Sequence, residues 1–135
     1  MLARGNVLLF GICLTVLTGC GTVLSCDDGR DVVWFTSSTE HMLNNGMRNF
    51  EDGNYSGAMT LFQSVIESKD ATKANKIESY KYLAFIHCIS DREKLCRESF
   101  KKALEIDPNF NLTPAEAGHP VWGSVFYNMR NKPVK

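Results

Sequence analysis

The stretch GMRNFEDGNYSGAMTLF, residues 46–62, decides the fold of this chain. Its centre, Asp52-Gly53-Asn54, combines turn-forming residues that end one helix and allow another to begin. After this turn, apolar residues recur at the 3.6-residue spacing of an amphipathic helix, namely Tyr55, Met59, Phe62, Val65 and Ile66. The stretch therefore predicts a helical hairpin, with one helix ending near Phe50 and the next running to about Ser68.

A second pair of helices is expected to follow the first. One should run from about Thr72 to Cys88, and the next should end at Asp107-Pro108, because proline disfavours the helical conformation in the residue before it. A final helix along residues 121–129 would cover the end of this pair with Trp122. Capping boxes, in which a hydroxyl and a carboxylate satisfy each other's amides, are predicted at Ser37–Glu40, Ser90–Glu93 and Thr113–Glu116.

The first 20 residues carry the pattern of a lipoprotein signal peptide. Arg4 gives a positive start, and Val7–Leu17 is an apolar run too short to span a bilayer, which takes about 20 apolar residues. Leu17-Thr18-Gly19-Cys20 matches the lipobox, whose cysteine thiol accepts diacylglycerol. We expect residues 1–19 to be removed and Cys20 to be lipidated. The alternatives are a plain secretory signal and an uncleaved anchor.

The residue after the lipidated cysteine bears on location. It is Gly21 and not Asp, and by resemblance to Gram-negative lipoproteins this permits sorting to the outer membrane, with the soluble domain in the periplasm. Residues 20–37 show no helical periodicity and are predicted to form a lipidated tether, whose Trp34-Phe35 either packs on the domain or binds a partner or bilayer. Residues 38–130 should form the helical domain with its C-terminal cap, and residues 131–135 a tail.

Composition points to one small domain without a strong charge preference. The 135 residues include 15 basic and 15 acidic side chains, so no overall field favours nucleic acid. Three scattered histidines, His41, His87 and His119, have no second ligand at metal spacing, and neither a phosphate-binding glycine loop nor a nucleophile motif is present. We therefore expect no enzyme activity, no metal or other cofactor, and no small-molecule substrate.

The five cysteines differ in their expected roles. Cys13 leaves with the signal peptide and Cys20 carries the lipid, which leaves three thiols in an oxidising compartment where disulfides persist. Cys88 and Cys96 lie eight residues apart across a predicted turn, so they are the expected pair. Cys26 would then be a free or intermolecular thiol. The alternative is that Cys88 and Cys96 are two buried free thiols.

The two predicted hairpins align on each other and together resemble the tetratricopeptide repeat. The first hairpin has the family's small and aromatic residues at Gly46, Gly53, Tyr55, Ala58 and Phe62, and the second has Ala84, Asp91, Glu93, Cys96 and Phe100 at the same spacings. Phe62 and Phe100 are 38 residues apart (100 − 62), against a usual period of about 34. We place the insertion between Lys69 and Lys76. Asp91 and Glu93 depart from the family's turn glycine and aromatic residue.

This resemblance implies an all-α fold of two tetratricopeptide-like helix hairpins plus a C-terminal capping helix. In such repeats the first helices of successive pairs line a concave face that holds a peptide or a helix of a partner protein. The resemblance assigns the following residues to that groove: Leu43, Met47, Phe50, Glu78, Lys81 and Phe85. The alternative is that Leu43 and Met47 belong to the core and that the protein's own tether fills the groove.

A closer resemblance lies in the C-terminal half. The stretch from His87 to Arg130, and above all AEAGHPVWG at residues 115–123, is similar to small tetratricopeptide lipoproteins of the TssQ type, which are associated with bacterial type VI secretion. This implies an accessory lipoprotein that recruits or stabilises an envelope component of the secretion system through protein contacts. The alternatives are an outer-membrane assembly or pilus-biogenesis accessory lipoprotein and a regulatory subunit of an envelope enzyme.

Overall fold

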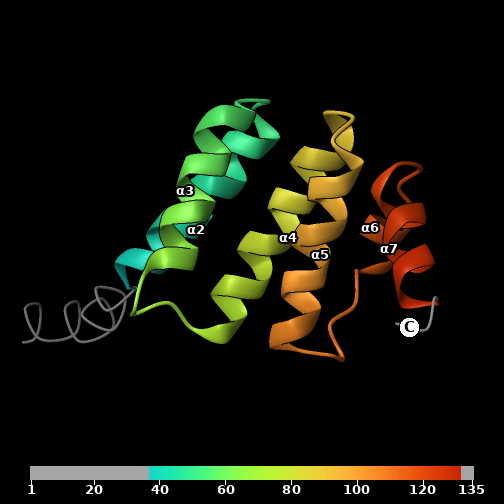
Figure 1. The fold of residues 1–135 in the computed structure, drawn as a ribbon. Coiled ribbons are helices and arrows are strands. Elements are labelled where there is room, and N and C mark those ends of the chain that lie inside the picture. The colour runs from blue at the N-terminus through green and yellow to red at the C-terminus, as the bar shows by residue number, and fades with distance from the viewer. Residues whose placement is uncertain (1–36, 132–135) are drawn as a thin grey trace, which may run out of the picture. The chain divides into compact units, whose positions relative to one another are not determined.

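The computed structural model describes residues 37–131, whose regular structure is helical, as the sequence predicts (Figure 1). The helices are α2 (Ser38–Glu51), α3 (Tyr55–Glu67), α4 (Lys73–Ile89), α5 (Glu93–Ile106), α6 (Pro114–Ala117) and α7 (Trp122–Arg130). They follow one another as three pairs, with α2 beside α3, α4 beside α5 and α6 beside α7. Within this part of the chain, each helix is too short or too polar to cross a membrane. The predicted signal peptide, most of the tether and the last four residues lie outside the described residues.

The turns of the first two pairs are built alike. In the first, Gly53 has a positive φ of 77°, its amide donates to the Phe50 carbonyl, and the next amide, of Asn54, reaches back to Asn49. In the second, Asp91 has a φ of 57°, and the Asp91 and Arg92 amides make the corresponding bonds to carbonyls at the end of α4. This is the Schellman ending, which needs one residue in the left-handed region. Asp91 therefore adopts the left-handed conformation at the position where the tetratricopeptide family has a turn glycine.

The capping box predicted at Ser90–Glu93 is wrong. Ser90 is the C-cap residue of α4, Arg92 precedes α5 without a side-chain cap, and the Glu93 carboxylate binds Arg97 instead. The Schellman ending uses the same residues that the box would need, so the two cannot coexist. The box predicted at Thr113–Glu116 is complete, and at the start of α2 the Ser37 hydroxyl accepts a bond from the Glu40 amide at 3.3 Å.

The first pair of helices is in close contact at Gly46. A methyl group built on this residue would lie 2.6 Å from the fully buried Phe62 ring of α3. Ala58, on the facing side of α3, is also fully buried. Small residues at this crossing therefore let the large Phe62 ring fill the space between the helices, as the sequence comparison of the two hairpins implied.

Gly46→Ala is expected to destabilise the fold by about 1–3 kcal/mol, because overpacking a filled core forces side chains and backbone to shift. The helix propensity of alanine opposes this loss by at most about 1 kcal/mol. Chemical denaturation of the variant measures the net change in the free energy of unfolding. Asn45→Ala, at an exposed position one residue earlier, is the matched control and should change the free energy of unfolding little. Equal stability of the two variants would contradict the close approach.

Two clusters of apolar side chains form the core, and α4 contributes to both. The cluster between α2, α3 and α4 contains Leu43, Ala58, Phe62, Val65, Leu83 and Ile86. The cluster between α4, α5 and the C-terminal helices contains Ala84, Phe85, Cys88, Cys96, Phe100, Leu112 and Phe126. Phe126 of α7 is fully buried and packs edge-on against Phe100, with ring centroids 5.0 Å apart. The C-terminal segment therefore closes the apolar end of the second helix pair.

Candidate functional site

A continuous row of aromatic rings connects all three helix pairs. In spatial order, this aromatic row consists of Tyr55, Phe50, Tyr82, Phe85, Trp122 and His119, with neighbouring ring centroids 3.2 to 5.7 Å apart. Tyr55 at one end is 39% exposed, whereas Phe85 in the middle is 2% exposed. Phe50, Tyr82 and Trp122 are half-buried. The row is therefore partly core and partly surface, which is the environment of aromatic anchors in protein interfaces.

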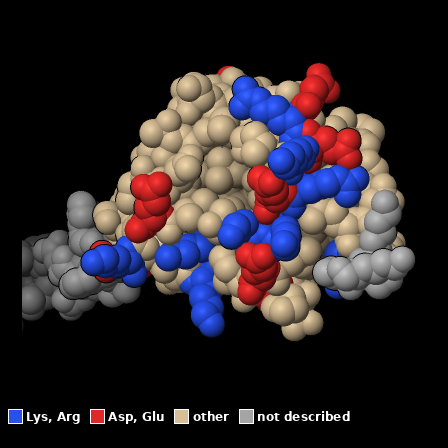
Figure 2. Space-filling view, viewed as in Figure 1, with Lys and Arg blue, Asp and Glu red and all other residues tan. Residues whose placement is uncertain are grey.

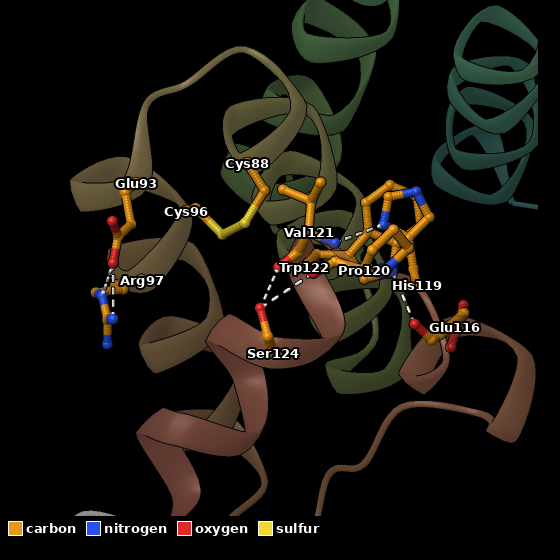
Figure 3. Close-up of a disulfide and its surroundings, with 10 residues drawn as sticks. All are labelled: Cys88, Glu93, Cys96, Arg97, Glu116, His119, Pro120, Val121, Trp122 and Ser124. Atoms are coloured by element: carbon orange, nitrogen blue, oxygen red, sulfur yellow. Dashed lines mark hydrogen bonds and ion pairs between the residues drawn. A yellow bond between two sulfur atoms is a disulfide. The ribbon is translucent and has the colours of Figure 1, made fainter.

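The C-terminal end of the row is held by the segment that joins α6 to α7 (Figure 3). Trp122 stacks on Phe85 of α4 with ring centroids 4.3 Å apart, and its Nε1 donates to the Glu116 carbonyl at 2.9 Å. His119 stacks in turn on Trp122, with the two rings nearly parallel. The expected role of Trp122, covering the end of the second helix pair, is confirmed.

A buried ammonium group lies beside the row. Lys81 Nζ is 2.5 Å from Glu78 Oε1 on α4 and 2.7 Å from Glu116 Oε1 on α6, and it lies 5.0 Å from the centroid of the Tyr82 ring. Burial alone would lower the pKa of Lys81, but its hydrogen bonds to Glu116 and Glu78 outweigh burial, so this pKa lies above its ordinary value. The ion pairs thus keep Lys81 charged and join α6 to α4.

The same contacts act on Glu116 in the opposite direction. Burial would raise the pKa of this carboxyl group, but the hydrogen bonds from Lys81 and from the Thr113 amide bring it below its ordinary value. A depressed pKa in the folded state gives stability that is present above the unfolded pKa, about 4.3, and lost as pH falls through the folded value. The stability that the Glu116–Lys81 contact gives to the packing of α6 on α4 therefore depends on pH.

Glu116→Gln is expected to destabilise the domain at pH 7, because Lys81 loses a charged partner, and to differ less from the unaltered protein at low pH. The measurement is chemical denaturation of both proteins between pH 3 and pH 7. Buried His87, whose pKa is lowered by burial and then by the charge of Arg92, is present in both proteins, so its contribution cancels in the difference. A difference that is constant over this range would contradict the linkage.

The structure places the six predicted groove residues in different environments. Phe50, Met47 and Glu78 are partly exposed, whereas Leu43, Lys81 and Phe85 are buried and cannot line an open groove. The prediction is wrong for those three because other segments cover them: Leu43 packs in the cluster with α3 and α4, Glu116 binds Lys81, and Trp122 stacks on Phe85. Sequence reasoning missed the members of the site that replace them, namely Tyr55, Tyr82, Glu116 and His119.

A disulfide joins the second helix pair at its turn. Cys88 near the end of α4 is bonded to Cys96 in α5, with their Cα atoms 5.1 Å apart, which is the pairing expected from the sequence. Beside it is a cavity of about 300 Å³ whose lining residues are Cys88, Asp91, Glu93, Val121, Ser124 and Val125. Figure 3 shows Val121 beside Cys88. Cys20 and Cys26 lie outside the described residues.

Replacing Cys88 and Cys96 together by serine is expected to lower the free energy of unfolding by about 2–3 kcal/mol, because the bond restricts a short loop of the unfolded chain. Calorimetry on the double variant and on the reduced protein measures this loss. Mass mapping of non-reduced peptides should show Cys88 bonded to Cys96 and not to Cys26. A bridge from Cys26 to either residue, or equal melting of oxidised and reduced protein, would contradict this assignment.

In the view of Figure 2, charged side chains of both signs gather over one half of the described domain. Figure 2 shows Lys, Arg, Asp and Glu interleaved over α4 and α5 and a largely uncharged area over α3. The ion pairs of α5 agree with this view, since Arg97 binds Glu93, and Lys101 and Lys102 lie near Glu105. Such alternation typifies a solvated helix face. In residues 37–131, no cluster of three or more His, Cys, Asp or Glu side chains could hold a metal ion.

No protein-family model, curated protein or solved structure matches this chain. The features that remain as a basis for function are the aromatic row, the carboxylates beside it and the lipobox predicted from the sequence. The first two lie on the described helices and on the segment between α6 and α7, and the third is a prediction from the sequence.

Proposed function

We propose that this chain is a membrane-anchored protein–protein interaction module, and specifically an accessory lipoprotein of a bacterial type VI secretion system. The observation that carries the proposal is the aromatic row. It spans three helix pairs and leaves Phe50, Tyr82 and Trp122 half-buried, with Tyr55 exposed at its end. Tyr and Trp dominate the binding energy of protein interfaces because they bury large rigid surfaces at small entropic cost. The exposed and half-buried members of the row form the surface to which we assign the partner.

A tetratricopeptide-like repeat is the arrangement that best accounts for the helix pairs. The left-handed turn residues Gly53 and Asp91 occupy equivalent Schellman endings, and they are separated by the same interval as Phe62 and Phe100. Two repeats are fewer than the three or so that usually bury their own faces, so such a stack needs a cap. The segment α6–α7 serves this purpose through Trp122 and Phe126.

Two parts of the proposal, the membrane anchor and the secretion system, are inferred from the sequence. Cys20 in the lipobox would hold the mature protein on the outer membrane, with residues 20–37 as the tether and the helical domain in the periplasm. The secretion assignment depends on the likeness of residues 115–123 to TssQ-type lipoproteins. In the fold, this stretch supplies Glu116, which binds Lys81, and Trp122, which stacks on Phe85. The same residues that carry the likeness thus build the cap.

The test is affinity purification of the tagged full-length protein from crosslinked membranes, followed by mass spectrometry of the captured proteins. We expect envelope components of a type VI secretion system to be enriched. Enrichment of outer-membrane assembly or pilus proteins, or of one envelope enzyme, would overturn the secretion assignment in favour of that system. Capture of no protein above an untagged control would overturn the interaction function itself.

Variants of two exposed tyrosines test whether the interface lies on the aromatic row. Tyr55 in the row is 39% exposed, and Tyr127 on α7, outside the row, is 47% exposed. Tyr55→Ser should reduce capture by about 30-fold if the ring is an anchor worth about 2 kcal/mol, whereas Tyr127→Ser should leave capture unchanged. Thermal melting of both variants controls for folding. Equal capture by the two variants would remove the row from the interface.

A further inference from the structure

The charged groups beside the aromatic row are unequally exposed. The side chain of Lys81 is 7% exposed, whereas those of its two partners, Glu78 and Glu116, are 34% and 20% exposed. A molecule that approaches this site therefore meets carboxylate oxygens, and the ammonium group lies behind them. Two carboxylates against one ammonium also leave the group with a net negative charge.

A third carboxylate strengthens this field. Glu51, the last residue of α2, is exposed and follows Phe50 directly in the chain. Tyr82, in the middle of the row, experiences all of these charges: burial raises the pKa of its hydroxyl group, Lys81 lowers it, and Glu78, Glu116 and Glu51 raise it. Glu78 and Glu116 outnumber the one ammonium group that they bind, and Glu51 follows Phe50 of the row in the chain, so the partly exposed section of the row has an acidic edge.

From this arrangement we propose that the aromatic row binds a cationic segment of its partner, one that presents Lys or Arg side chains toward Glu51 and Glu78. The inference deepens the proposed interaction function and depends on it. A negative edge beside half-buried aromatic rings suits a cation twice, because carboxylates pair with its charge and aromatic rings attract it. The site contains its own example, since Lys81 Nζ already lies 5.0 Å from the Tyr82 ring centroid. Acidic segments are disfavoured by the same carboxylates.

The direct test compares two labelled peptides, one alternating Arg and Ser and one with Glu in place of each Arg. Their binding to the full-length protein in non-ionic detergent is measured by fluorescence anisotropy. We expect the Arg peptide to bind at least about tenfold more tightly than the Glu peptide, and its affinity to fall as salt screens the charges. Equal affinities of the two peptides would overturn the proposal.

Two charge-neutralising variants locate the effect. Glu51→Gln removes a carboxylate beside the row and should weaken binding of the Arg peptide by about threefold to tenfold. Glu67→Gln removes another exposed carboxylate, at the far end of α3, and should not change the binding of the Arg peptide. Neither residue makes an ion pair in the described part of the chain, so folding should be unaffected, and melting checks this. Equal effects of the two variants would also overturn the proposal.

Failure of this inference can be told apart from failure of the interaction function. If Tyr55→Ser abolishes capture of the envelope partner and Glu51→Gln leaves it intact, the charge preference is wrong and the interaction stands. If neither variant reduces capture, the row is not the interface, and the inference falls with it. Loss of capture in both variants, with melting unchanged, supports the two together.

Discussion

Phe85→Ala is expected to lower the free energy of unfolding by about 3–5 kcal/mol, the usual loss when a buried phenylalanine ring is truncated to alanine. Phe85 is 2% exposed, lies in the cluster that joins α4, α5 and α7, and stacks on Trp122. Removal of the Phe85 ring leaves a cavity and also takes away the surface on which the capping Trp122 ring stacks. Domains of this size are stable by about 5–15 kcal/mol in total, so this one change removes a large share.

The measurement is circular dichroism during thermal and chemical unfolding. Tyr127→Ala, which truncates an exposed aromatic residue on α7, is the control and should melt like the unaltered protein. An unchanged melt for Phe85→Ala, together with lost partner binding, would mean that Phe85 faces a partner, as the resemblance to tetratricopeptide repeats implied. A collapsed melt confirms it as a core residue and leaves the interface to the exposed members of the row.

Cys20→Ser is expected to move the protein from the membrane fraction to the soluble fraction. A lipobox cysteine carries two or three acyl chains, which hold a protein firmly, whereas a single chain binds only marginally. Cys26→Ser is the control, since it removes a thiol from the same segment without touching the lipobox, and this variant should stay with the membranes. If Cys20→Ser still sediments after a high-salt wash, the chain is held by another means, such as an uncleaved N-terminal anchor.

The helices could be predicted because their signals are local. The apolar periodicity from Tyr55 onward gave the bounds of α3 within one residue, and the stop at Asp107-Pro108 gave the C-terminal end of α5 within one residue. The turn at Ser90–Glu93 was harder, since the same residues satisfy the spacing of a capping box and the ending of the preceding helix. The structure has the helix ending and not the capping box, since Asp91 adopts the left-handed conformation.

The candidate site could be predicted only in part, because its decisive contacts join distant residues. The resemblance assigned Phe50 and Glu78 to the groove, and both are partly exposed, but it could not show what would cover Lys81 and Phe85. Both are covered by the cap: Glu116 binds Lys81, and Trp122 stacks on Phe85. No periodicity or spacing relates α4 to that segment. Tyr82 was missed for a related reason, since its ring becomes part of a site only when Phe50 packs beside it.

The most direct test of partner binding through the aromatic row is site-specific photocrosslinking in intact membranes. A photoreactive phenylalanine analogue replaces Tyr55 in one variant, Tyr127 in a second and Lys101 of α5 in a third. We predict a discrete crosslink to one envelope protein from position 55 and none from positions 127 and 101. Crosslinks from position 127 or 101 but not from position 55, in variants that fold and remain on the membrane, would contradict it.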